Sequence, residues 1–120
     1  MICRFKEVII LIKSKYKAVK TIVDGITFFS IKEAKRYKEL KLLERAGMIE
    51  ELQLQVPFVL FSKSKYGRVV KYIADFTYYE LLSGDKRKYI VEDVKGMKTP
   101  VYKLKKRIMA ECYGIVIKEV

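Results

Sequence analysis

The sequence predicts a single domain of the α/β class, with helices packed on a mixed (α+β) sheet. An N-terminal β-hairpin comes first, and the remaining elements follow the order αβββαβ. The chain has 120 residues, of which 51% are hydrophobic, so it can supply one core but not two. Helix-capping signals occur near residues 30 and 99, and apolar segments of strand length lie between them. We therefore expect a meander of strands between two helices, followed by a final strand.

The β-hairpin is predicted before the first helix. Asp24-Gly25 suits a two-residue turn, because such turns favour residues that tolerate positive φ at both central positions. Apolar and β-branched residues flank this pair, so we expect strands at 21–23 and 26–29. Residues 1–15 are an N-terminal extension of unknown role, and residues 16–120 form the predicted domain.

The first helix is predicted over residues 31–46. Ser30 and Glu33 have the spacing of a capping box, in which two side chains accept hydrogen bonds from otherwise unpaired backbone N–H groups. Gly47 suits the end of this helix. The face expected to pack on the sheet carries Ala34, Tyr37 and Leu40.

Three strands are predicted next, at 52–61, 68–80 and 88–95. The first alternates apolar residues with other residues, which is the period of a half-buried strand. Pro57 inside this strand favours a sheet edge or a bulge, because proline cannot donate a backbone hydrogen bond. Turns rich in serine and glycine separate the strands.

A second helix and a final strand complete the predicted fold. Thr99-Pro100 predicts the N-cap and the first helical position, and Gly114 predicts the end. The apolar stripe of this helix is expected to consist of Val101, Leu104, Ile108, Met109 and Cys112. A strand follows over 115–120, and a strand-helix-strand succession favours a right-handed crossover to a parallel partner.

Charge and composition limit the possible functions. The net charge of +12 favours a polyanionic partner such as nucleic acid, since lysine and arginine neutralise phosphates. A basic protein without such a partner explains the charge alone equally well. The chain contains no histidine, which excludes histidine-dependent nucleophiles, histidine general bases and most zinc sites. Chemistry is left to carboxylates, lysine, tyrosine or an oxygen-bound metal ion.

The sequence predicts a cytoplasmic protein with no membrane partner. The apolar residues 8–12 are too few to span a membrane, and the N-terminus lacks the pattern of a signal peptide. Cys3 and Cys112 are far apart in sequence and have no metal-ligand spacing. Cys112 is expected in the core, which fits a reducing compartment. Residues 8–12 are expected either in core packing or in a contact between subunits.

Charged residues interrupt two apolar strands that are predicted to be neighbours. Asp75 lies in the second strand, and Asp93 and Lys95 lie in the third. Side chains alternate along a strand, so Asp93 and Lys95 should project from one face, with Val94 on the other. The antiparallel meander brings Asp75 and Asp93 within reach of one metal ion. Two carboxylates held on strands could bind Mg²⁺, and the lysine ammonium would then lie beside the water that the metal ion activates.

Each of these residues also has a structural interpretation. Asp75 could simply lie on the solvent-exposed face of a half-buried strand, and Asp93 and Lys95 could form an ordinary salt bridge. Glu33 borders the packed face of the first helix, where it either approaches the charged strands or serves the capping box. Glu92 points away from Asp93 and is expected to be structural or solvated.

The order of these residues on helix, strand and strand resembles the PD-(D/E)xK nuclease superfamily, which has a restriction-endonuclease-like αβββαβ core. The chain also resembles, over residues 16–120, a small phage and prophage family of formerly unknown function. The motifs are Asp24-Gly25-Ile26, Glu33-Ala34, Leu42-Leu43-Glu44-Arg45-Ala46-Gly47, Ile73-Ala74-Asp75-Phe76, Val91-Glu92-Asp93-Val94-Lys95-Gly96 and Tyr102-Lys103-Leu104-Lys105-Lys106. Two departures from the superfamily pattern are Ala74 in place of proline and Asp93 in place of the commoner glutamate.

The resemblance implies Mg²⁺- or Mn²⁺-dependent hydrolysis of DNA phosphodiesters. Asp75 and Asp93 would hold the metal ion together with the backbone carbonyl of Val94. Lys95 would orient the attacking water or stabilise the transition state, and Glu33 would complete the metal shell or position water. Phosphate contacts are assigned to Lys71, Lys86, Arg87, Lys88, Lys98, Lys103, Lys105, Lys106 and Arg107.

Within this superfamily we expect a structure-selective endonuclease that cuts Holliday junctions or other branched DNA in phage recombination. A two-fold junction cut on two strands implies a homodimer, acting in a bacterial or phage-infected cell. A nickase and a transposon-end nuclease share the same core and remain alternatives. A non-catalytic nucleic-acid-binding module on a nuclease fold is the alternative from a different functional class.

Overall fold

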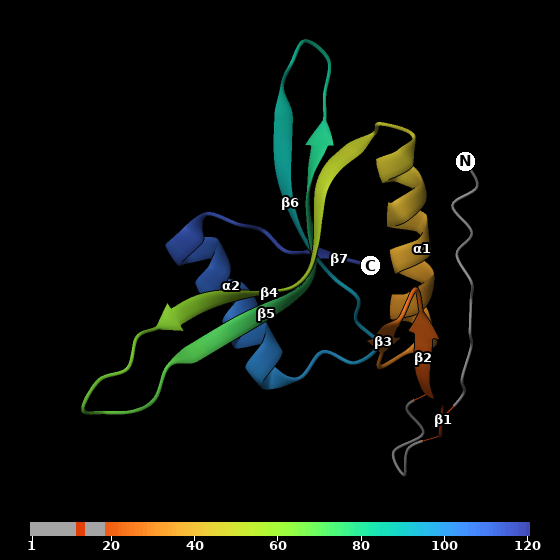
Figure 1. Ribbon diagram of the computed structural model, residues 1–120. Helices are drawn as coiled ribbons and strands as arrows, with labels where there is room; N and C mark the ends of the chain where they lie inside the picture. The colour runs from red at the N-terminus through yellow and green to blue at the C-terminus, as the bar shows by residue number, and fades with distance from the viewer. Residues whose placement is uncertain (1–11, 14–18) are drawn as a thin grey trace. The chain divides into compact units, whose positions relative to one another are not determined.

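The computed structural model in Figure 1 describes residues 12–13 and 19–120. The chain divides into two compact units at Leu42 and Leu43, inside helix α1 (Ile31–Arg45). Apart from residues 12 and 13, the predicted N-terminal extension, the segment 8–12 and Cys3 lie outside the described residues. No helix formed by the described residues is long and apolar enough to cross a membrane.

The N-terminal unit contains the predicted β-hairpin. β2 (Val19–Val23) and β3 (Ile26–Phe28) pair antiparallel, and Val23 lies opposite Ile26. Asp24 and Gly25 form the turn with φ of 53° and 75°, which is the positive-φ pair that the Asp-Gly sequence predicts. A two-residue strand, β1 (Ile12–Lys13), pairs with the other edge of β2.

Helix α1 begins and ends close to its predicted limits. Its start is capped by Ser30, whose Oγ accepts a hydrogen bond from the backbone N–H of Glu33 at 3.1 Å. Its end is closed by the hydrogen bond from Met48 N to Leu43 O. Ala34, Tyr37 and Leu40 are buried as predicted, and the ring of Tyr37 lies 5.1 Å from that of Phe28 in β3.

The C-terminal unit is built on a four-stranded mixed sheet with the order β4-β5-β6-β7. β4 (Ile49–Phe61), β5 (Val70–Leu81) and β6 (Arg87–Asp93) form the predicted antiparallel meander. β7 (Lys118–Glu119) is parallel to β6, as the predicted crossover requires. The described elements from α1 onward therefore follow the order αβββαβ, and the mixed α+β fold is confirmed.

Strand β4 lies at an edge of this sheet, one of the two alternatives that Pro57 predicted, because β5 is its one strand partner among the described residues. It begins three residues earlier than expected, at Ile49 instead of residue 52. The register shifts between Glu50 and Gln53, and Glu51 has a φ of 55°. This bulge interrupts the alternation of side chains, which concealed the start of the strand from the sequence pattern.

Helix α2 (Pro100–Tyr113) has the predicted cap, since Thr99 Oγ1 accepts a hydrogen bond from Tyr102 N at 3.1 Å. Its predicted apolar stripe was largely wrong. Val101, Leu104 and Cys112 are exposed, whereas Tyr102 and Met109 are buried. A tyrosine can bury its ring while its hydroxyl keeps a polar partner, so Tyr102 displaces the aliphatic residues from the packed face.

The core of the C-terminal unit lies between the sheet and α2. Tyr72, Ala74 and Val91 come from the sheet, Tyr102 and Met109 come from α2, and Ile117 precedes β7. Phe58, Leu60 and Ile115 pack against this cluster. The core thus fixes the ends of β5 and β6 against the first turn of α2, which is where the candidate site lies.

Candidate active site

Asp75 and Asp93 lie opposite each other where the β5–β6 ladder ends. The last pair of the ladder is Phe76 with Glu92, and the next position in this antiparallel register pairs Asp75 with Asp93. Asp75 Oδ2 accepts a hydrogen bond from the backbone N–H of Val94 at 2.9 Å. The carboxylate of Asp75 therefore accepts from Val94 in place of a backbone carbonyl of the neighbouring strand. Strand β6 ends at Asp93 instead of continuing to the predicted residue 95.

Asp93 is buried, with a relative exposure of 2%. Its Oδ2 accepts a hydrogen bond from the hydroxyl of Tyr72 at 2.5 Å. Its Oδ1 lies 3.3 Å from Lys95 Nζ, yet it accepts no hydrogen bond from any residue that the structure describes. One oxygen of this buried carboxylate is therefore oriented by tyrosine, while the other has lone pairs available.

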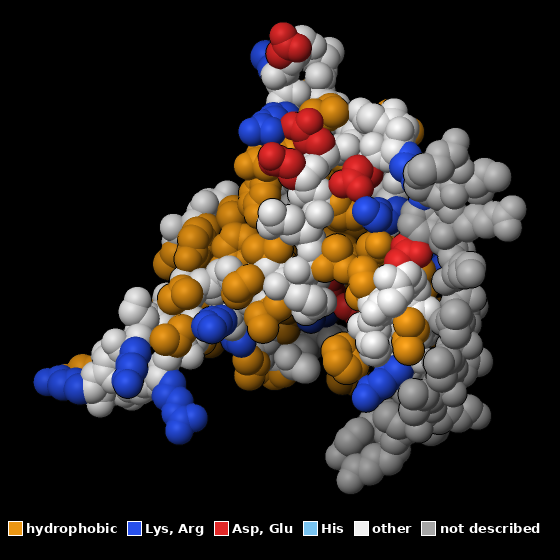
Figure 2. All heavy atoms as spheres, in the orientation of Figure 1, with side chains coloured by type: hydrophobic (Ala, Val, Ile, Leu, Met, Phe, Trp, Pro, Cys, Tyr) orange, Lys and Arg blue, Asp and Glu red, His pale blue; other side chains and the backbone are white. Residues whose placement is uncertain are grey.

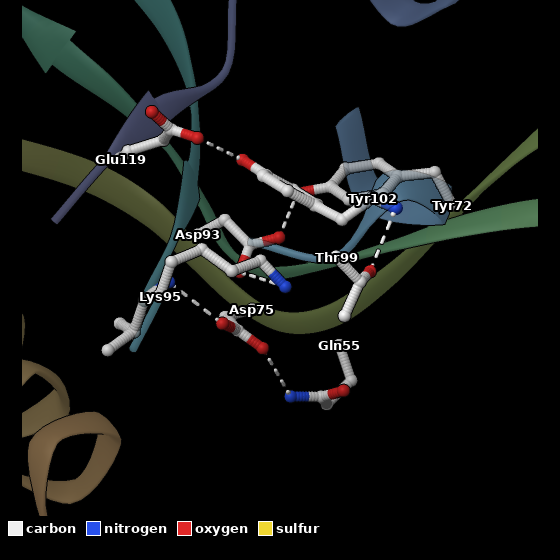
Figure 3. A network of polar contacts seen from close by, with 9 residues as sticks. Gln55, Tyr72, Asp75, Asp93, Lys95, Thr99, Tyr102 and Glu119 are labelled. Carbon is white, nitrogen blue, oxygen red and sulfur yellow. Dashed lines mark hydrogen bonds and ion pairs between the residues drawn. The ribbon is translucent and has the colours of Figure 1, made fainter. Parts of the chain in front are cut away.

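Lys95 is held between an acid and an aromatic ring. Its Nζ pairs with Asp93 Oδ1 and lies 4.1 Å from the ring centroid of Tyr102, which is within the range of a cation–π interaction. Its side chain retains 26% exposure. Asp75, Asp93 and Lys95 lie close together in Figure 3, so the grouping predicted from the sequence is present within the C-terminal unit.

The protonation of Asp93 reflects this crowding. Burial raises the pKa of Asp93 from 3.8 to about 6, and the neighbouring carboxylate of Asp75 adds to the increase. The hydrogen bond from Tyr72 and the charge of Lys95 act in the opposite direction on this pKa without cancelling the increase. Burial and the hydrogen bond to Asp93 also raise the pKa of Tyr72, so this tyrosine remains a hydrogen-bond donor.

Gln55 is a site neighbour that the sequence did not reveal. Its Nε2 donates to Asp75 Oδ1 at 3.4 Å, and the β4–β5 register places it opposite Asp75. Gln55 has a φ of 53°, a conformation that is uncommon for residues other than glycine. Tyr72 and Tyr102 were also missed, because tyrosines inside apolar segments predict packing unless the strand register is known.

Glu119 anchors the far side of Tyr102. Its Oε2 accepts a hydrogen bond from Tyr102 Oη at 2.8 Å, and its Oε1 lies 3.1 Å from both Lys98 Nζ and Lys106 Nζ. The Tyr102 hydrogen bond and the two lysines lower the pKa of Glu119 to about 2. Two of the predicted phosphate-binding lysines are therefore engaged by this carboxylate.

The charged group opens into a cavity of about 290 Å³. Asp75, Asp93 and Lys95 line it, and Lys71 and Lys105 add positive charge from β5 and α2. The cavity is thus basic overall but has two adjacent carboxylates. This combination can hold a cation and an anionic group at the same time.

Other predicted residues lie away from this cavity. Arg87 and Lys88 pair with Leu81 and Glu80, roughly 20 Å along β5 from Asp75 at the usual rise of a strand. Lys86 is in the adjoining turn. Arg87 pairs with Glu50 at 2.7 Å. The structure therefore does not bring this cationic group to the carboxylates, and its assignment to DNA binding stays a prediction.

The remaining assignments lie on helices. Lys103 and Arg107 are exposed on α2, and Arg107 pairs with Glu111 at 3.3 Å. Glu33 lies in the first turn of α1 and belongs to the N-terminal unit, so its catalytic role stays a prediction.

Within the described part of the chain, no group of three or more acidic, cysteine or histidine side chains could hold a metal ion. Glu92 is buried and accepts a hydrogen bond from Tyr78 at 2.6 Å, as a structural residue does.

Comparison with known proteins gives one assignment. No curated protein and no solved structure matches the chain significantly. A family model matches residues 13–118, which include the hairpin, both helices and all of the cavity residues. The chain therefore belongs to the family described as "Protein of unknown function (DUF1064)".

Proposed function

We propose that this protein is a metal-dependent DNA endonuclease of the PD-(D/E)xK type. The observation that carries the proposal is the grouping of Asp75, Asp93 and Lys95 in a cavity with further lysines. Two carboxylates and a lysine suffice for metal-assisted hydrolysis, and the chain has no histidine for another route. The net charge of +12 suits a polyanionic substrate.

The donor set fits Mg²⁺ or Mn²⁺. Asp93 Oδ1 is buried and accepts no hydrogen bond among the described residues, and the carboxylate of Asp75 is its neighbour. Mg²⁺ retains several waters and needs only one or two protein carboxylates, so Asp75, Asp93 and the Val94 carbonyl are sufficient. When bound, the metal ion would act as a Lewis acid and lower the pKa of a coordinated water.

The other residues of the site have roles that follow from their contacts. Tyr72 orients Asp93, while the Val94 N–H orients Asp75. The Lys95 ammonium is directed into the cavity by Asp93 and the Tyr102 ring, so it can stabilise negative charge that develops on a phosphodiester. Lys71 and Lys105 line the same cavity and bind the flanking phosphates.

The preferred substrate is branched DNA such as a Holliday junction, acted on by a homodimer. This part of the proposal rests on the resemblance to resolvase-like phage proteins and on the large share of positive charge. A nickase or transposon-end nuclease would use the same residues. A non-catalytic nucleic-acid-binding module would use the cationic residues and leave the carboxylates without a role.

The test is cleavage of a panel of labelled duplex, flap and four-way junction DNAs with Mg²⁺ or Mn²⁺. Asp75→Asn and Asp93→Asn should each abolish cleavage, because they remove the metal-binding charge. DNA binding should survive or tighten, since repulsion between carboxylate and phosphate is lost. Asp85→Asn is the matched control, because Asp85 is exposed in a turn with a φ of 58° and asparagine tolerates this conformation.

Wild-type cleavage that both site variants lose and the control retains would exclude the non-catalytic module. Absence of cleavage on every DNA with either metal would contradict the proposal.

A further inference from the structure

We propose that the tip of the β4–β5 hairpin is an arm that binds the phosphate backbone of duplex DNA beside the cut. The arm consists of residues 61–70. The inference rests on the proposed function and extends it, since it assigns a second DNA-contacting surface and the position of that surface relative to the cleaved bond.

The arm is strongly and uniformly basic. The sequence from Leu52 to Ala74 contains no acidic residue, but it contains Lys63, Lys65, Arg68 and Lys71. Figure 2 shows lysine and arginine side chains gathered at the end of this projection. Because phosphates repel carboxylates and attract ammonium groups, a surface of this composition binds nucleic acid with little electrostatic opposition.

The opposite end of the sheet provides a contrast. The β5–β6 turn and its neighbours carry Lys86, Arg87 and Lys88, but also Glu50, Glu51, Glu80 and Asp85. Arg87 is within 2.7 Å of Glu50 and 3.7 Å of Glu51. The cations at that end are therefore offset by neighbouring acids, whereas the cations of the arm have no acidic neighbour in the segment from Leu52 to Ala74.

The tip has a defined conformation. Ser64 and Gly67 exchange backbone hydrogen bonds of 3.0 and 3.3 Å, and Tyr66 N donates to Ser64 Oγ at 3.1 Å. Lys65 and Tyr66 therefore form the extreme point, and Tyr66 is 86% exposed. A two-stranded ribbon has the width that the major groove of DNA admits, and an ordered tip loses little entropy on binding.

The arm is continuous with the site. Lys71, Ile73 and Asp75 alternate along β5 and all line the cavity. Tyr66 precedes Asp75 by nine residues, which corresponds to a reach of roughly 30 Å at the rise of a β-strand. A phosphodiester in the cavity would place the arm over DNA up to about nine base pairs away, at about 3.4 Å per base pair.

The test compares the binding of duplex and junction DNA in Ca²⁺, which supports binding without the need for cleavage. The arm variant carries Lys63→Gln, Lys65→Gln and Arg68→Gln, all at exposed positions. The control carries Lys35→Gln, Arg45→Gln and Lys118→Gln, which remove the same charge from other exposed positions. A third variant with Lys63→Arg, Lys65→Arg and Arg68→Lys preserves the charge.

The arm variant should bind at least about tenfold more weakly at about 0.1 M salt, with a salt-dependence slope smaller by about 2 to 3, as expected for three phosphate contacts. The control should change much less, and the charge-preserving variant should bind like the wild type. Footprinting should show the wild type protecting a segment on one side of the site that the arm variant leaves open.

Equal losses in the arm variant and the control would overturn the inference, and unchanged affinity in the arm variant would do the same. A wild type that binds through the arm but cuts no DNA would contradict the proposed nuclease while leaving the arm standing. Thermal unfolding of each variant excludes misfolding as the cause of weaker binding.

Discussion

Asp93 combines three influences on one carboxylate: burial, a hydrogen bond from Tyr72 and the proximity of a second carboxylate on Asp75. A buried acid with an acidic neighbour disfavours its own ionised form. Lys95 offsets only part of this cost, because its ammonium is shared between Asp93 and the Tyr102 ring. When both are ionised, the carboxylates of Asp75 and Asp93 therefore repel each other, and a bound divalent cation would reduce this repulsion.

The burial of Asp93, together with its repulsion by Asp75, predicts a pH-dependent stability for the protein without a bound metal ion. The folded-state pKa of Asp93, about 6, lies above its ordinary value of 3.8. The stability contribution of Asp93 is therefore fully present below about pH 4 and is lost as the pH rises through about 6, at a cost of about 3 kcal/mol. The pKa of Glu119 is lowered to about 2, so the stability contribution of this residue changes only at lower pH.

Urea unfolding in a chelator at about pH 5 and about pH 7.5 measures this effect. The wild type should lose more unfolding free energy between these values than Asp93→Asn, in which position 93 cannot ionise. Asparagine still accepts from Tyr72 and can donate to Asp75, so the variant should be the more stable protein near pH 7.5. Parallel pH profiles for the two proteins would refute the link between Asp93 and stability.

Lys95 should act on the rate and not on binding. Its ammonium points into the cavity from a fixed position, so Lys95→Ala should lower the single-turnover cleavage rate by about a hundredfold or more. DNA affinity should change little. Lys105→Ala, at another lysine of the same cavity, should show the reverse pattern of weaker binding with a smaller effect on the rate at saturation. A large affinity loss in Lys95→Ala with an unchanged rate would make Lys95 a phosphate anchor.

At the scale of elements, the site is formed by neighbouring strands of the C-terminal sheet and by the first turn of α2. β4 supplies Gln55 and β5 supplies Tyr72 and Asp75, while the first turn of α2 supplies Tyr102. The Gln55 amide donates to Asp75 from a backbone with a φ of 53°, which is costly for a residue with a side chain. Local strain of this kind often occurs at functional positions.

Substitution of Gln55 separates backbone strain from side-chain function. Gln55→Gly should be more stable than Gln55→Ala by about 1 kcal/mol, because glycine adopts positive φ without a steric cost. Both variants should lose cleavage activity to the same degree, since both lose the hydrogen bond to Asp75. Chemical unfolding and cleavage rates, compared between the two, provide the check. Greater stability in the alanine variant would contradict the backbone assignment.

The elements were predictable where short-range signals decide the structure. Asp24-Gly25, Ser30 and Thr99-Pro100 each determine a local conformation, and the structure contains all three. Asp75, Asp93 and Lys95 could be selected because charge interrupts apolar strands. Gln55, Tyr72 and Tyr102 could not, since their roles depend on the registers between the strands and on how α2 rotates against the sheet. Cys112 was misplaced for the same reason, because the burial of Tyr102 sets that rotation.

At the scale of the molecule, the proposed two-fold junction substrate predicts a dimer that spans two DNA arms. Sedimentation velocity at the protein concentrations used for cleavage should show a dimer, and four-way junctions should bind more tightly than duplexes of equal length. Affinity should fall steeply with salt, because most contacts go to phosphates. A monomer with equal affinity for both DNAs would remove the proposed junction-resolving role and favour a nickase, without contradicting the proposed nuclease activity.

Whether Asp75 and Asp93 hold a divalent cation is tested most directly by Mn²⁺ binding, followed by electron paramagnetic resonance. The wild type should bind Mn²⁺ at one site, and Asp75→Asn and Asp93→Asn should each weaken that binding at least about tenfold. Affinity should rise between about pH 5 and about pH 7.5, as Asp93 loses its proton. Wild-type binding that both variants retain, or no Mn²⁺ binding at all, would contradict the claim.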